Sequence, residues 1–153
     1  CMLHAPVGDA VDPASMPSLA VNAGIPMLGL FGGEQITLDD AHAILPLEKC
    51  LLEQVRPERD ESKAIPETSY LPQRALLVLG AVYGELLKKL PGVKGEWATD
   101  PAHPFSVGMQ FSGPGSPRGV NGNVVGKVMK LYLRGRSESL SEFARSVRDK
   151  VAP

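Results

Sequence analysis

The chain has 153 residues, enough for one domain that buries about 70% of the surface exposed by the unfolded chain, so neither metal nor disulfide is needed to support a core. Its 43% hydrophobic and 22% charged residues are typical of globular proteins, and 16 Gly and 14 Pro indicate many turns. Residues 75–84 form the most apolar run. It is too short for a bilayer, which takes about 20 residues, so no transmembrane span is predicted.

The formal net charge of −1 conceals an asymmetry along the chain. Residues 1–70 carry eleven acidic and four basic residues (−7), whereas residues 71–153 carry six acidic and twelve basic ones (+6). Two interpretations stay open. Either the halves pack against each other, or the basic half faces a charged partner.

The first 33 residues are predicted to form an irregular arm before a single α+β domain over residues 34–153, because four prolines and five glycines interrupt any regular pattern. Only residues 26–31 are apolar enough for a short strand or a crossing of the core. Cys1 raises an alternative, since the N-terminal cysteine of a mature bacterial lipoprotein carries its lipid. The protein is then anchored to the envelope; otherwise a cytoplasmic location is expected.

Two short helices are predicted next, one over residues 38–44 capped by Thr37 and one over residues 46–55, because Pro46 suits a first helical turn but not an interior. Cys50 lies on the apolar side of the second helix and is expected to be a buried free thiol. A charged, exposed linker follows over residues 56–67.

Residues 72–90 give the strongest helix signal, with leucine, valine and tyrosine on one broad face, so this helix is expected to be central and largely buried. Its Gly80 and Gly84 let another backbone approach closely. An antiparallel hairpin is then predicted from residues 94–99 and from the alternating apolar residues of 105–112.

A Gly/Pro-rich loop over residues 112–123 leads to a helix over residues 123–133. Ser139 and Glu142 have the spacing of a capping box and predict the start of a final helix. The fold class is therefore α+β, with a central apolar helix, an antiparallel hairpin and two C-terminal helices.

The best functional lead is a stretch without acidic residues, from Pro101 to Ser137, that contains five cations. Three of them, Lys127, Lys130 and Arg134, fall within about 60° of one another on a helical wheel, opposite a wide apolar arc. They predict a basic contact face whose partner is an acidic protein, a small anion or the acidic half of the same chain.

The loop before this helix also suggests an anion site, since Asn121 or Asn123 caps a helix whose first amides and dipole attract anions. The phosphate-binding loop template fails, because three residues rather than four separate Gly122 from Gly126, and Val128 stands where Ser or Thr binds magnesium.

Other chemistries have less support. Nucleic-acid binding is disfavoured, because the basic face lacks exposed aromatic residues and the net charge is negative. His4, His42 and His103 are far apart and neither cysteine has a nearby second one, so neither a metal nor a cofactor is predicted. Asp100 is expected to hydrogen-bond its own backbone in a turn rather than to act as an acid or base with His103.

The sequence therefore favours a non-enzymatic bacterial binding or inhibitory protein that uses the basic helix and the Gly-rich loop. The alternatives are a small anion-binding domain or enzyme with a phosphate or carboxylate site at the loop, and the envelope lipoprotein. The candidate anion- or partner-binding residues are Arg118, Asn121, Gly122, Asn123, Lys127, Lys130 and Arg134.

Overall fold

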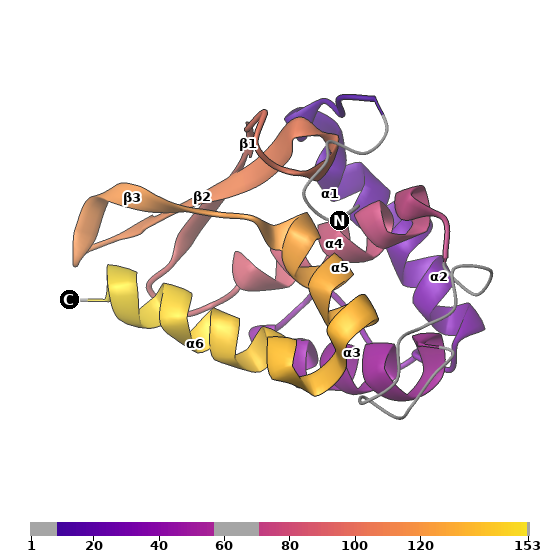
Figure 1. Ribbon diagram of the computed structural model, residues 1–153. Helices are drawn as coiled ribbons and strands as arrows, with labels where there is room; N and C mark the ends of the chain where they lie inside the picture. Colours follow the sequence, from indigo (N-terminus) through magenta and orange to yellow (C-terminus); the bar gives the residue numbers. More distant parts are fainter. Residues whose placement is uncertain (1–8, 57–70, 153) are drawn as a thin grey trace.

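The computed structural model describes residues 9–56 and 71–152, and it confirms the α+β class (Figure 1). One antiparallel sheet has the strand order β1-β2-β3, with β1 (Lys94–Thr99), β2 (Val107–Gly113) and β3 (Ser116–Gly122). The α-helices are α1 (Met16–Leu19), α2 (Ile25–Leu30), α3 (Ile44–Cys50), α4 (Gln73–Leu87), α5 (Val124–Arg134) and α6 (Leu140–Val151). Short 3-10 or π segments are η2 (Pro13–Ser15), η3 (Ala20–Gly24), η4 (Ala41–Ala43), η5 (Leu51–Val55), η7 (Pro104–Ser106) and η8 (Gly135–Glu138).

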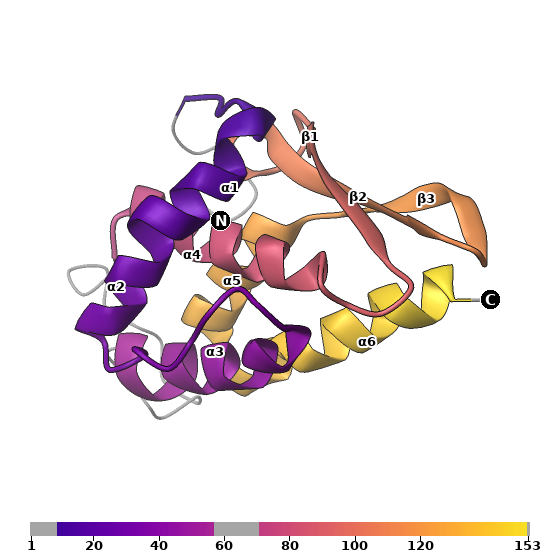
Figure 2. The ribbon, with the colours of Figure 1, turned by 180° about the vertical axis from the view of Figure 1, so that it is seen from behind.

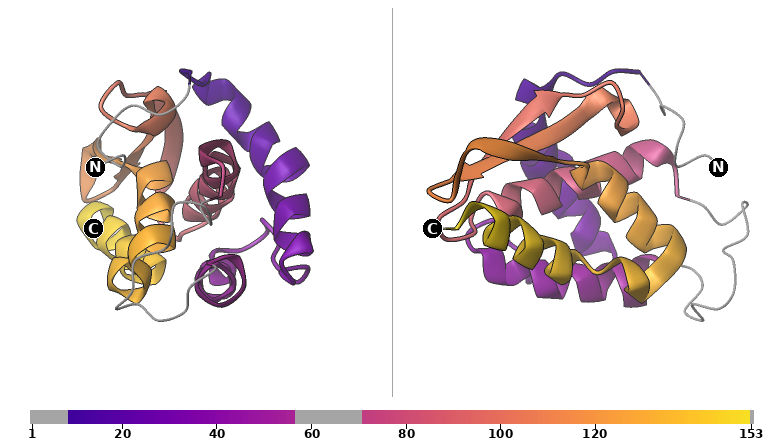
Figure 3. Two further views of the ribbon diagram at one scale, coloured as in Figure 1. Left: turned by 45° about the vertical axis from the view of Figure 1, so that its right-hand side comes forward. Right: turned by 60° about the vertical axis from the view of Figure 1, so that its left-hand side comes forward.

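α4 is the centre of the fold, as the sequence predicts, and eleven of its fifteen residues are buried. Figure 3 (left) shows α4 nearly end-on, with the N-terminal helices on one side and α5 on the other. At Gly80 an added Cβ would lie 3.0 Å from the Cα of Val125, so the close backbone approach predicted for this glycine is confirmed. At Gly84 an added Cβ would instead collide with the Trp97 ring.

Most of the N-terminal arm is helical, so the prediction of irregular structure is wrong for residues 13–30, as is the strand at 26–31. Elements η2 to α2 follow one another without a break (Figure 2). The helix tolerates Pro26 because the preceding turn, η3, is a wider π turn that closes on the N–H of Ile25. Met16, Ala20 and Leu28 are buried in the common core, so this helical segment is part of the packed structure.

The helix after the arm begins at Ala41, capped by Asp40, whose carboxylate accepts a hydrogen bond from the His42 N–H at 2.7 Å. The predicted start near Thr37 is therefore wrong. The predicted break between two helices before Pro46 is also wrong, because η4, α3 and η5 follow one another without a gap. Pro46 does lie in a first helical turn, as predicted. Cys50 is buried and free, as predicted.

The sheet has a third strand in place of the predicted Gly/Pro-rich loop. Residues Ser116–Gly122 pair with β2, with Phe111 opposite Val120 and Gln110 opposite Asn121. β3 is an edge strand, where Pro117 can be accommodated. The predicted pairing of β1 with β2 is confirmed, with Trp97 opposite Met109, although β2 begins at Val107.

Two long-range contacts fix the C-terminal helix. The Tyr83 hydroxyl donates to the carbonyl oxygen of Leu140 at 2.7 Å. The Glu48 carboxylate accepts hydrogen bonds from the Ser139 hydroxyl at 2.9 Å and from the Ser141 N–H at 3.0 Å. The predicted cap is also confirmed, because the Ser139 hydroxyl accepts from the Glu142 N–H. No helix within residues 9–56 and 71–152 is both long and apolar enough to cross a membrane.

Burial of Tyr83 predicts a loss of stability at alkaline pH. Burial, followed by the negative charge of Glu48, raises the pKa of Tyr83 well above its ordinary value of 10.0. Because the unfolded chain loses the phenol proton first, stability is fully present below about pH 10 and falls as pH rises further. Tyr83→Phe should cost about 1 kcal/mol at neutral pH through the lost hydrogen bond, and this difference should shrink by about 1 kcal/mol between about pH 10 and about pH 11.

Urea unfolding of both proteins across that pH range measures the difference directly. A Tyr83→Phe deficit that stays constant from neutral to alkaline pH would contradict the burial of an un-ionised phenol.

Candidate functional site

The N-terminus of α5 is closed by its own cap, as predicted. Asn123 accepts a hydrogen bond from the Gly126 N–H at 2.9 Å through its side-chain oxygen, and its carbonyl accepts the Lys127 N–H, also at 2.9 Å. An anion bound at this terminus would compete with the Asn123 side chain for the Gly126 N–H.

The residues before α5 lie on a strand and not in an open loop. Gly122 is buried, and a Cβ there would lie 2.8 Å from the Phe111 ring. Asn121 and Arg118 are exposed on β3. Arg118 is four residues from the end of the strand, about 13 Å along it at 3.3 Å per residue. The structure therefore separates Arg118 from the cations of α5.

Three cations lie on one side of α5 and are called the basic face: Lys127, Lys130 and Arg134. The opposite side of the helix is buried, through Val124, Val125, Val128, Met129, Leu131 and Tyr132. The side chain of Lys127 is 19% exposed and that of Arg134 is 47% exposed. The helical wheel thus places the cations correctly on the side opposite the core, but Lys127 is largely buried rather than exposed.

Within the part of the chain that the structure describes, one carboxylate approaches the basic face. The Glu138 Oε1 atom lies 3.7 Å from Lys127 Nζ and 4.0 Å from Arg134 Nη1. Glu138 belongs to η8, which directly follows α5 and folds back beside it. Two cations thus share a single negative charge, and both distances are long for ion pairs.

The acidic half of the chain does not neutralise the basic face in the described part of the structure. No ion pair joins an acidic residue of 9–56 to Lys127, Lys130 or Arg134. Glu48, one of the acidic residues of that half, is instead hydrogen-bonded at the start of α6. The rest of the predicted linker, residues 57–67, lies outside the described residues, as do Cys1 and His4.

Arg56 supports the site and was missed by the sequence prediction, which placed it in an exposed linker. Its side chain is only 4% exposed. Its Nε donates to the carbonyl oxygen of Tyr132 at 2.6 Å, and Nη2 donates more weakly to that of Leu133 at 3.5 Å. A cation at the C-terminal carbonyls of a helix is favoured by the helix dipole. Arg56 therefore fixes the end of α5 that carries Arg134.

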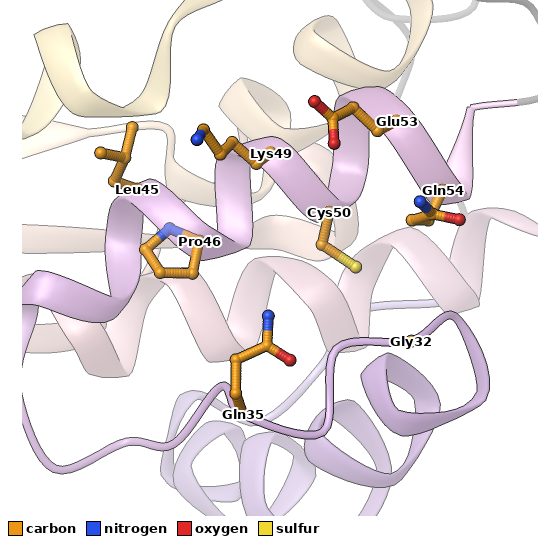
Figure 4. Close-up of a pocket in the computed structure, with 8 residues that line it drawn as sticks. All are labelled: Gly32, Gln35, Leu45, Pro46, Lys49, Cys50, Glu53 and Gln54. Carbon is orange, nitrogen blue, oxygen red and sulfur yellow. The ribbon is translucent and has the colours of Figure 1, made fainter.

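A pocket of about 360 Å³ beside α3 contains the Cys50 thiol (Figure 4). Figure 4 shows the sulfur directed towards the chain segment that carries Gly32 and Gln35. Burial is the main cause that raises the pKa of the Cys50 thiol, with Glu34 and Glu53 adding to it. This is the opposite of an activated nucleophile, whose pKa is lowered.

The Asp100 turn has the predicted structure, since the Asp100 carboxylate accepts a hydrogen bond from the Ala102 N–H at 3.1 Å. His103 Nδ1 lies 3.5 Å from the other carboxylate oxygen. Phe105 and Ser106, which follow Pro104, have φ values of 58° and 56°, which are rare for residues with side chains. Among the described residues, no three His, Cys, Asp or Glu side chains form a group that could hold a metal ion.

Comparison with known proteins adds no assignment to this geometry. The chain matches no family model, no curated protein and no solved structure.

Proposed function

We propose that the protein is a non-enzymatic binding protein that engages an acidic partner through the basic face of α5. The observation that carries this proposal is the charge balance at the face, where three cations face one carboxylate among residues 9–56 and 71–152. Within these described residues the local charge is +2, in a chain whose net charge is −1. A concentrated positive surface steers acidic partners and favours their binding.

The rigidity of α5 also supports the proposal. Asn123 caps one end of the helix, Arg56 binds the carbonyls at the other, and the apolar side packs on α4. The cations therefore project from a fixed backbone, which lowers the entropy cost of binding.

The alternatives receive less support. A small anion at the start of α5 would have to compete with the Asn123 side chain for the Gly126 N–H. An enzyme that uses Cys50 conflicts with the raised pKa of this thiol.

Charge reversal tests the proposal with a defined acidic probe. A fluorescent oligoglutamate peptide should bind the wild-type protein at about 0.02 M NaCl and dissociate at about 0.5 M NaCl, where the Debye length is only a few ångströms. Lys130→Glu with Arg134→Glu should weaken binding by about tenfold or more, as measured by fluorescence anisotropy. The matched control is Lys89→Glu with Lys94→Glu, two exposed lysines elsewhere, which changes the net charge equally.

Removal of the Glu138 carboxylate should have the reverse effect. Glu138→Gln should tighten peptide binding by about two- to fivefold, because Lys127 and Arg134 lose the carboxylate that competes with the peptide for them. Glu96→Gln changes the net charge equally on the exposed surface of β1 and should have little effect. Equal binding by the two charge-reversed proteins, or no binding by the wild type at low salt, would refute the assignment of the basic face.

A further inference from the structure

A second surface, independent of the basic face, lies between α3 and α6. It is a pocket of about 340 Å³, within the size range of small-molecule sites. α6 contributes side chains at helical spacing, η4 and the first turn of α3 contribute two residues each, and the segment after α4 contributes a leucine. We call it the α3–α6 pocket. Its lining residues are Ala41, His42, Ile44, Leu45, Leu90, Ser141, Ala144, Arg145 and Arg148.

The floor of the α3–α6 pocket is apolar. Ile44 and Ala144 are 4% and 5% exposed, and Leu90 is partly buried against the core. Leu45 is 53% exposed at the margin, which is unusual for a large apolar side chain. Together these side chains offer a surface to an aliphatic chain.

The polar margin of the pocket is cationic. Arg145 and Arg148 are three residues apart on α6, and neither Asp nor Glu is among the lining residues. Arg148 has a weak internal partner, since its Nε lies 3.9 Å from the Asp149 carboxylate, and His42 contacts Asp40 at 2.8 Å. Arg145 is exposed and has no ion pair with any residue that the structure describes. Its guanidinium is therefore open to an external anion.

Ser141 adds a further polar group at the pocket. Its Oγ is buried and has no hydrogen-bond partner among the described residues, whereas its N–H is bound to Glu48.

We propose that the α3–α6 pocket binds a medium-chain aliphatic carboxylate. The guanidinium of Arg145, assisted by Arg148, binds the carboxylate, a group whose geometry matches the planar donor pair of arginine. The aliphatic chain lies across Leu45, Leu90 and Ala144. A small carboxylate without a chain would leave the apolar floor uncovered, and a neutral chain would leave the Arg145 guanidinium without a bound anion.

Calorimetric titration with decanoate tests this site. Decanoate should bind the wild-type protein, whereas acetate, which lacks the chain, and decanol, which lacks the charge, should bind at least tenfold more weakly. Arg145→Gln should weaken decanoate binding by at least fivefold. Lys150→Gln removes the same charge from an exposed position of α6 outside the pocket and should leave binding unchanged.

Two further variants test the contact with the aliphatic chain and the independence of this site from the basic face. Leu45→Ala should weaken decanoate binding without changing the response to salt, because it removes only contact with the chain. Lys130→Glu should leave decanoate binding intact, so this test is independent of the basic face. Equal affinities for decanoate and decanol, equal effects of Arg145→Gln and Lys150→Gln, or no decanoate binding would each overturn the proposal.

Discussion

Arg56→Ala should lower the free energy of unfolding by about 2–3 kcal/mol, because hydrogen bonds from a charged donor contribute about 1.5–3 kcal/mol. The guanidinium donates to the Tyr132 and Leu133 carbonyls at the end of α5 and is almost completely buried. Its favourable interaction with the helix dipole is lost as well. Urea unfolding followed by circular dichroism gives the magnitude.

Arg74→Ala is the matched control, because Arg74 is exposed on α4 and its removal should change stability by less than about 0.5 kcal/mol. Arg56→Ala should also weaken oligoglutamate binding, since the α5 terminus that carries Arg134 loses its anchor. If Arg56→Ala is as stable as Arg74→Ala, the buried position assigned to Arg56 is wrong.

The second large effect is expected at the contact between the N-terminal helices and α4. Gly24→Ala should destabilise the protein by about 1–3 kcal/mol through overpacking. The added Cβ would collide with the Val82 side chain and would lie 2.8 Å from the backbone oxygen of Val78. The backbone atom cannot move without displacing α4.

Gly29→Ala provides the opposite case within the same helical segment. Its Cβ would meet only the Glu34 side chain at 4.0 Å, and helical glycine is less favourable than alanine by up to about 1 kcal/mol. Gly29→Ala should therefore raise the melting temperature while Gly24→Ala lowers it. Similar shifts in both variants would mean that this segment does not pack on α4 as described.

The elements that the sequence predicts well are those whose pattern is local. α4 has an uninterrupted apolar face, and the caps at Asn123 and Ser139 act over three residues. The alternation from Val107 to Phe111 also identifies β2, because its apolar side chains are buried there while Gln110 is exposed. Each pattern is complete without knowledge of the rest of the chain.

The missed elements depend on distant partners or on unusual backbone geometry. The N-terminal helix accommodates Pro26 through a π turn and Gly24 through close contact with α4, neither of which local periodicity reveals. β3 is poor in typical strand residues and exists because β2 supplies its hydrogen-bonding partner. Gly119, with φ of 87°, adopts a conformation there that suits glycine.

The candidate site was predictable only in part. The spacing of Lys127, Lys130 and Arg134 places them opposite the buried side of their helix, and this follows from helical periodicity alone. The approach of Glu138 depends on how η8 turns after Gly135, whose φ is 84°. The contact of Arg56 with Tyr132 spans 76 positions, a separation at which a sequence pattern carries no signal.

The most direct test of the basic face is amide chemical-shift mapping by NMR during titration with oligoglutamate. The largest shifts should fall on Lys127, Lys130, Arg134 and the neighbouring Glu138, and they should disappear at about 0.5 M NaCl because the interaction is screened. Shifts confined to other elements, or shifts that persist at high salt, would contradict the proposal that α5 is the surface that binds acidic partners.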